Sequence, residues 1–131
     1  MKGLQITLTE TGYDLLTAYL EHNSLSAFNR KKLLNELENA RIVSSDYLPL
    51  NIVNYNTKIV VWNMDKNQTF TVHLVLPDET NGKEKISIFD PISLALIGYP
   101  SGAVTQWEMP DGINTFKVVS VSPVDKSSVY A

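Results

Sequence analysis

Few side chains in this sequence could do chemistry, and the sharpest local signal is a step from a strand into a helix. Phe89, Asp90, Pro91 and Ile92 follow an apolar run, and Asp before Pro is typical of a helix start. The same four residues could form a rigid corner that contacts a partner, because proline fixes its own backbone angle. Both interpretations are kept, since a helix cap and a partner contact can coexist.

A second group of polar side chains surrounds a predicted turn. Asn23 and Ser24 interrupt one apolar pattern, and Arg30, Lys31 and Lys32 fall in the first turns of the next. Three cations at the start of a helix oppose the helix dipole, so helix stability does not explain them. A solvated face is the simpler interpretation, and the alternative is a contact with phosphate or with an acidic partner surface.

The sequence lacks the common signatures of catalysis and of metal binding. It has no cysteine, no glycine-rich phosphate loop, no His-Glu-x-x-His run and no nucleophile elbow. His22 and His73 have no metal-ligand spacing with any pair of carboxylates. Trp62 and Trp107 lie in strand-like segments, where aromatic residues belong more often to the core than to a binding groove. We therefore predict a protein that is not an enzyme and that uses no metal or cofactor.

The composition fits one compact domain, or one small domain with an appendage. The chain has 131 residues, of which 44% are hydrophobic, and a formal net charge of −3. This charge excludes a basic nucleic-acid coat, so any contact with nucleic acid would be local. No apolar stretch reaches the roughly 20 residues that span a bilayer, and no signal peptide is evident. Together with the absence of cysteine, these features predict a cytoplasmic protein that contacts no membrane.

The first third of the chain has a helical pattern. Leu16 and Leu20 recur at helical spacing after a capping sequence that starts at Thr11. Ser26 can cap a second helix. Its apolar stripe consists of Phe28, Leu33, Leu34, Leu37 and Ala40. The short connection between the two favours an antiparallel helical hairpin, and the alternation over residues 3–9 predicts a short strand before it.

From Pro49 onward the apolar residues recur with period two, which is typical of strands. The predicted strands are residues 58–63, 69–76, 85–89, 104–109 and 114–121, with turns at 65–67 and 110–112. A short helix from Pro91 to Ile97, ended by Gly98, interrupts them. Residues 122–131 are predicted to fray. The pattern predicts an α+β fold, an antiparallel sheet with one short helix on its face.

The segment from Ile86 to Gly98 resembles the C-terminal signature of the Gre-factor family, in which a strand leads into a short helix that ends at glycine. Leu48-Pro49, Ile52-Val53 and residues 56–59 resemble the family's join between coiled coil and globular domain. Residues 107–112, Trp-Glu-Met-Pro-Asp-Gly, resemble the Rnk branch (regulator of nucleoside diphosphate kinase). The resemblance runs from Leu33 to Val121.

The resemblance implies two parts. Residues 1–45 would form a short coiled-coil hairpin, and residues 46–131 an FKBP-like domain of the GreA/GreB C-terminal type. It also implies that the protein binds RNA polymerase at the rim of the secondary channel through residues 89–92 and inserts the hairpin into the channel. No sequence-specific contact with nucleic acid is expected.

Two departures from the Gre pattern predict binding without transcript cleavage. Gre factors carry acidic residues at the hairpin tip that help to hold a catalytic magnesium ion, whereas residues 22–30 contain no Asp or Glu. The first predicted helix, about 12 residues or about 18 Å long, is also shorter than in a Gre hairpin. Asp90 stands where the family has serine. The alternatives left open are a prolyl isomerase and a plain protein-interaction module, and the oligomeric state is undecided.

Overall fold

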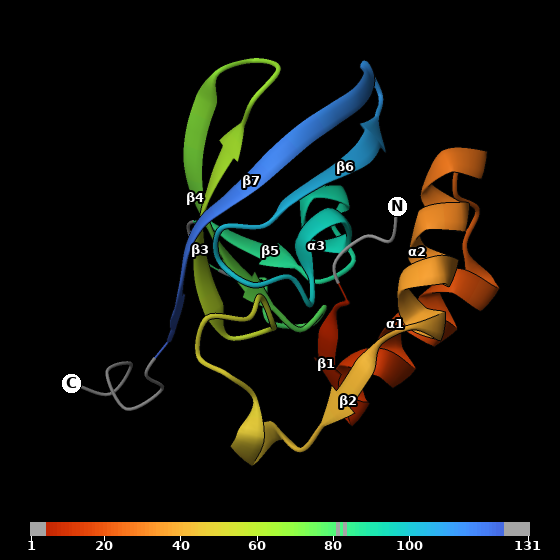
Figure 1. The fold of residues 1–131 in the computed structure, drawn as a ribbon, viewed down its shortest axis with the longest axis vertical. Coiled ribbons are helices and arrows are strands. Elements are labelled where there is room, and N and C mark those ends of the chain that lie inside the picture. Colours follow the sequence, from red (N-terminus) through yellow and green to blue (C-terminus); the bar gives the residue numbers. More distant parts are fainter. Residues whose placement is uncertain (1–4, 81, 83, 125–131) are drawn as a thin grey trace.

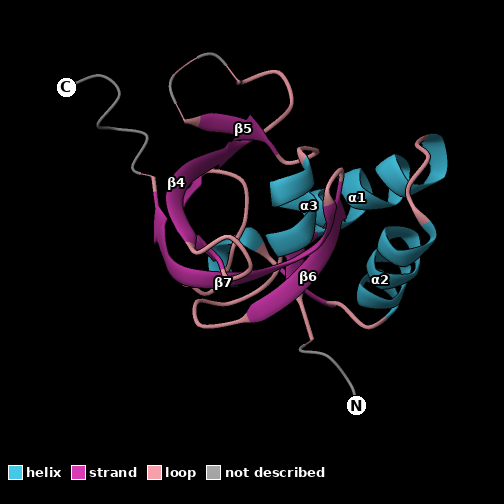
Figure 2. Ribbon diagram, turned by 90° about the horizontal axis from the view of Figure 1, so that it is seen from above, coloured by secondary structure: helices cyan, strands magenta, loops and turns pink. Residues whose placement is uncertain are grey.

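The computed structural model describes residues 5–80, 82 and 84–124, and its main feature is a five-stranded sheet in the order β5–β4–β3–β7–β6. The strands are β3 (Thr57–Asn63), β4 (Gln68–Val75), β5 (Lys85–Ser87), β6 (Val104–Met109) and β7 (Gly112–Pro123). The sheet curls, and the short helix α3 (Pro91–Leu96) lies on its concave side (Figures 1 and 2).

Period-two sequence produces this sheet because alternate residues point into the core. On β3, Ile59 and Val61 are fully buried, whereas Lys58 lies on the opposite face of the strand and is exposed. The predicted turn at residues 65–67 joins β3 to β4, with Asn67 at a φ of 51°. The predicted hairpin of β6 and β7 is also present, with Met109 paired to Gly112. These strand predictions are confirmed, with shifts of one or two residues at most ends.

The sheet is mixed, so the prediction of a purely antiparallel sheet is wrong at one edge. β5 runs parallel to β4, with His73 opposite Lys85. The polar segment between these strands is long enough to carry the chain back before it enters β5, whereas a tight turn would have forced an antiparallel pair. β7 also continues through Ser122 and Pro123, which the sequence placed in a frayed tail. Residues 125–131 of that tail lie outside the described part.

Two helices pack on each other and form the predicted hairpin. They are α1 (Glu10–His22) and α2 (Ala27–Glu38). Ser26 caps α2 as predicted, because its Oγ accepts a hydrogen bond from the backbone N–H of Asn29 at 3.2 Å. α1 begins earlier than predicted: Thr9, and not Thr11, is its cap, with Oγ1 accepting from the N–H of Gly12 at 3.1 Å.

A parallel pair of three-residue strands, β1 (Thr7–Thr9) and β2 (Arg41–Val43), lies where α1 begins and α2 ends. The predicted first strand is thus shorter than expected, with residues 3 and 4 outside the described part, and β2 was not predicted. A single turn of 3-10 helix (Ser45–Tyr47) follows β2. The pair is attached to the sheet domain, because the N–H of Thr7 donates to the carbonyl of Gly98 at 3.0 Å.

One hydrophobic cluster extends from the hairpin into the sheet. It contains Leu16 and Leu33 from the helices together with Phe116 and Trp107 from the sheet. The core position predicted for Trp107 is confirmed. That of Trp62 is wrong, because this side chain is half-buried on the outer face of the sheet and falls outside the cluster. Within the described ranges, no helix is long and apolar enough to cross a membrane.

Candidate functional site

The corner between β5 and α3 is held by local hydrogen bonds. Asp90 Oδ1 accepts from the N–H of Ile92 at 3.1 Å and caps the helix as the sequence predicted. The hydroxyl of Ser93 donates to the carbonyl of Ser87 at 2.7 Å, and Ser87 Oγ accepts from the N–H of Phe89 at 3.0 Å. The corner is therefore rigid before any partner arrives, which lowers the entropy cost of a contact there.

The four predicted contact residues do not share one environment. Pro91 is exposed, while Asp90 and Ile92 are half-buried. The ring of Phe89 stacks on Tyr19 of α1, with centroids 4.9 Å apart and planes at 29°. One face of Phe89 thus belongs to the seam between the hairpin and the corner, and Asp90, Pro91 and Ile92 remain as the outward surface.

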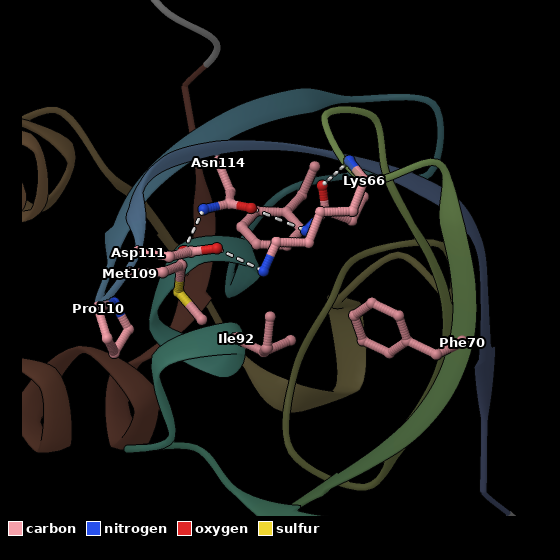
Figure 3. Close-up of a pocket in the computed structure, with 9 residues that line it drawn as sticks. Lys66, Phe70, Ile92, Met109, Pro110, Asp111 and Asn114 are labelled. Carbon is pink, nitrogen blue, oxygen red and sulfur yellow. Dashed lines mark hydrogen bonds and ion pairs between the residues drawn. The ribbon is translucent and has the colours of Figure 1, made fainter.

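Ile92 also forms part of the wall of a pocket of about 340 Å³ on the concave side of the sheet. Figure 3 shows side chains from both hairpin turns, from β4 and from α3 converging on this space. Its lining is Asn63, Lys66, Phe70, Ile92, Met109, Pro110, Asp111, Asn114 and Phe116. The volume lies at the lower end of the range for ligand sites, and the mainly apolar walls suit apolar side chains of a partner.

The mouth of the pocket is fixed by polar groups from the two hairpin turns. Lys66 Nζ lies 2.5 Å from Asp111 Oδ2, and the amide of Asn63 donates to Asn114 Oδ1 at 3.0 Å (Figure 3). Hydrogen bonds from Lys66 and Asn114 lower the pKa of Asp111. Sequence reasoning found only Ile92 of this lining. The sequence did contain one signal for the pocket mouth: the two predicted turns carry side chains of opposite charge, Lys66 in one and Asp111 in the other.

The residues predicted at the hairpin tip divide into two groups. Asn23, Ser24 and Lys31 are exposed on or beside the loop between α1 and α2. Arg30 donates from Nη1 to the carbonyl of Leu20 at 3.3 Å, so its charge lies at the carboxyl end of α1, where the helix dipole favours a cation. This contact explains why a cation stands at the start of α2, where the dipole of α2 itself disfavours one.

Lys32 does not belong to a solvated face, so that prediction is wrong for this residue. Its side chain is only 16% exposed, and Nζ lies 2.6 Å from Glu36 Oε2. The ammonium also sits 5.2 Å from the ring centroid of Tyr99 and 5.5 Å from that of Trp107. Burial lowers the pKa of Lys32, although Glu36 acts in the opposite direction. The sequence offered no signal for this, because the aromatic partners are far away along the chain.

The same cluster ties α2 to the sheet domain. The hydroxyl of Tyr99 donates to Glu36 Oε2, and burial, followed by the charge of Glu36, raises the pKa of Tyr99. Beside it, Asn29 Nδ2 donates to the carbonyl of Glu108 at 2.9 Å while its Oδ1 accepts from the N–H of Glu108 at 2.7 Å. Helix α2 is therefore fixed against strand β6.

The two histidines lie apart from this cluster. His22 is exposed at the end of α1, and His73 is half-buried on β4. Among the residues that the structure describes, no three His, Asp or Glu side chains gather in a way that could hold a metal ion.

Residues 48–123, more than half of the chain, match the family model described as transcription elongation factor GreA/GreB, C-terminal. The chain belongs to the GreA/GreB family. The matched range includes the residues of the corner, of the pocket lining and of all five strands of the sheet. The family resemblance seen in the sequence is confirmed.

Curated relatives of this GreA/GreB family chain come from several bacteria. It is 33% identical over 86 residues to transcription elongation factor GreA of Helicobacter hepaticus, which covers 65% of this chain and 53% of the relative. It is 30% identical over 107 residues to GreA of Clostridium botulinum, with 79% and 67% covered. It is 28% identical over 81 residues to the regulator of nucleoside diphosphate kinase of Escherichia coli, with 61% and 60% covered. The chain thus spans about half to two thirds of the length of these relatives.

Solved structures give the same assignment at the level of the fold. A transcription elongation factor GreA/GreB from Nitrosomonas europaea superposes with a TM-score of 0.66 at 27% identity, covering 91% of this GreA/GreB family chain and 98% of the other. Thermus aquaticus Gfh1, at 19% identity and a TM-score of 0.50, shares the fold. The finer description of the sheet domain as FKBP-like stays a prediction.

Proposed function

We propose that this protein is a transcription regulator of the Gre/Rnk kind that binds RNA polymerase at the rim of the secondary channel and does not stimulate transcript cleavage. The observation that supports docking most directly is the preformed apolar pocket beside the rigid corner at residues 89–92. The division of the chain near residue 45 into hairpin and GreA/GreB C-terminal-like domain, and a place in the cytoplasm, belong to the same proposal.

The corner and the pocket together have the features of a binding hot spot. Pro91 is exposed at the corner, and Ile92 extends from it into the pocket wall. An apolar side chain of the polymerase would enter the pocket, while Asp90 offers its second carboxylate oxygen to a donor at the edge. A buried apolar anchor surrounded by polar groups is the arrangement in which interfaces concentrate their energy.

The hairpin supports the second half of the proposal. The exposed tip residues Asn23 and Ser24 are neutral, and the nearest carboxylate in the sequence is the single Glu21 in the last turn of α1. One carboxylate does not make a strong magnesium site. Helix α1 has 13 residues, or about 20 Å at the usual rise per residue. The hairpin would therefore reach only a short way into a channel.

Polymerase affinity tests the docking site. We expect Ile92→Glu to weaken binding to core RNA polymerase by about thirtyfold, which corresponds to the loss of one hot spot of about 2 kcal/mol. Glutamate in the first turn of a helix is favourable, so α3 should still form. Val104→Glu is the matched control, since Val104 is 47% exposed on β6 and lies outside the pocket lining. An Ile92→Glu protein that melts like wild type and binds polymerase with unchanged affinity would contradict the docking site.

A backtracked elongation complex tests the absence of cleavage activity. Added protein should leave transcript cleavage at the polymerase's own rate, and it should reduce stimulation by a genuine Gre factor that competes for the same rim. Magnesium-dependent cleavage above background would contradict this part of the proposal and would leave the proposed polymerase binding untouched.

The aromatic lining of the pocket also favours one second candidate, prolyl isomerisation. Phe70 and Phe116 line the space, and an apolar pocket with aromatic walls can hold a proline ring. A proline-peptide isomerisation assay decides this candidate, with Ile92→Glu expected to abolish any rate above the spontaneous one. A plain interaction module would show neither polymerase binding nor isomerase activity.

A further inference from the structure

The outer face of the sheet, opposite the pocket, carries cations and no carboxylate on its central strands. The outward side chains include Lys58 and Trp62 on β3, His73 on β4 and Lys117 on β7. The whole chain, in contrast, has a net charge of −3. This face is therefore locally positive on a protein that is acidic as a whole, and a local field of this kind selects an anionic partner.

Three of the basic side chains form a row across neighbouring strands. Lys58 is directly opposite His73, and His73 is directly opposite Lys85 on the short edge strand. Strands lie about 4.8 Å apart, so the two lysines start about 10 Å from each other with the imidazole between them. Among the residues that the structure describes, Lys32 and Lys66 form ion pairs, whereas the lysines of this face form none.

His73 reports the field at the centre of the row. Burial lowers its pKa, the charges of Lys85 and Lys58 lower it further, and only Glu79 acts in the opposite direction. Its Nε2 atom is buried without a hydrogen-bond partner in the described part of the structure. The imidazole therefore lies in a local field in which Glu79 only partly offsets the charges of the two lysines.

Trp62 gives the same face an aromatic surface. Its ring is half-buried, and Nε1 donates to Asn67 Oδ1 at 3.2 Å, which holds the ring in place. Lys117 lies directly opposite it on β7. Along β3, Trp62 is four residues from Lys58, or about 13 Å. A cationic row and a fixed aromatic ring thus lie on one surface.

We propose that this outer face binds single-stranded nucleic acid without sequence preference, with phosphates at Lys58 and Lys85 and a base stacked on Trp62. Stacking selects a single strand, because the faces of bases in a duplex are covered by their neighbours. The proposal is independent of the pocket: Phe70 and Phe116 point to the concave side, so a protein docked through Ile92 would keep the outer face free.

Fluorescence anisotropy with a labelled single-stranded RNA of mixed sequence tests the proposal. We expect binding at about 50 mM salt that weakens about tenfold at about 200 mM, as for two or three phosphate contacts. Lys58→Glu with Lys85→Glu should weaken it at least about tenfold, and Trp62→Ala by about tenfold. The control, Lys31→Glu with Arg41→Glu, makes the same change in net charge at two exposed sites away from this face and should retain wild-type affinity.

The thermal melts of the charge variants should match wild type, since the substituted lysines and Arg41 are exposed. A magnetic resonance titration adds a local readout: bound phosphate should raise the pKa of His73, because it offsets the two lysine charges. The proposal is overturned by no wild-type binding at low salt, by an equal loss in the control variant, by tighter binding of duplex or of an acidic peptide, or by an unchanged His73 pKa in the complex.

Discussion

Three segments of the chain meet at Gly98, the residue that ends the short helix. Its N–H donates to the carbonyl of Val53 at 2.9 Å, and its carbonyl accepts from Thr7 at 3.0 Å. Its φ is +88°, and a methyl group there would lie 2.7 Å from the Cβ of Ile6. Both the backbone angle and the close approach of β1 therefore require glycine.

Replacing Gly98 by alanine should lower the free energy of unfolding by about 2–5 kcal/mol, from the unfavourable angle together with overpacking against Ile6. Gly102→Ala is the matched control, because Gly102 has a φ of +90° but no atom within 4 Å of the added methyl group. It should cost only the backbone part, about 1–2 kcal/mol. Urea denaturation measures both values, and equal losses would show that the contact with Ile6 carries no energy.

Local signals at single residues were readable from the sequence, and contacts between distant residues were not. Ser26 and Asp90 cap helices within three residues of their own positions, Gly98 follows the end of α3, and all three predictions are confirmed. Lys32 was placed on a solvated face because its partners Tyr99 and Trp107 are brought to it only by the packing of α2 on the sheet. The docking role of residues 89–92 stays a prediction.

At the scale of elements, α2 and β6 are joined through the side chain of Asn29, whose amide takes the place of a peptide group in a neighbouring strand. The amide of Asn29 makes both hydrogen bonds to the backbone of Glu108, as a neighbouring peptide group would. β6 is an edge strand of the sheet. The contact therefore satisfies part of an edge that would otherwise be open to solvent or to another strand.

Asn29→Ala should lower the free energy of unfolding by about 1–3 kcal/mol, because both backbone groups of Glu108 lose their partner at a site that is largely buried. Hydrogen exchange of the Glu108 amide should become faster in the same variant. Asn35→Ala, at an exposed position of the same helix, should change stability by less than about 0.5 kcal/mol. Unchanged exchange at Glu108 would mean that the edge is protected by other contacts.

The sequence missed the strand β2 and the parallel pairing of β5, because both depend on partners that are distant along the chain. β2 has three residues, too few for a periodic pattern, and β5 was predicted as a strand but without its parallel partner. The long strands β3, β4 and β7 were recognisable because their alternation alone defines an inner and an outer face. The core position of Trp62 was predicted wrongly for a different reason. Alternation defines two faces of a strand, but the pattern by itself does not say which face packs on the core.

At the scale of the whole molecule, the hairpin and the sheet share a core. Leu16 and Leu33 are fully buried in the same cluster as Phe116 and Trp107. The Lys32–Glu36–Tyr99 contacts and the stack of Tyr19 on Phe89 reinforce this seam. Neither part would keep its apolar surface covered if the other moved away.

We therefore expect one cooperative unfolding transition. Helical signal from far-ultraviolet circular dichroism and fluorescence from the two tryptophans, both in the sheet, should give the same midpoint in urea. Asn29→Ala should move both midpoints together. Loss of helical signal at a lower urea concentration than the loss of tryptophan fluorescence would show instead that residues 1–45 behave as a separate unit, as the division predicted from the sequence would have it.

The parallel pair of β1 and β2 also bears on how such a protein can change over evolutionary time. Because α1 begins and α2 ends at this pair, the paired strands hold the base of the helical hairpin together whatever the length of its helices. Matched insertions of whole helical turns beyond Asn23 would move the tip outward and leave the base, the seam and the pocket in place. The reach of the hairpin can thus change by insertion or deletion without any change in the proposed docking surface.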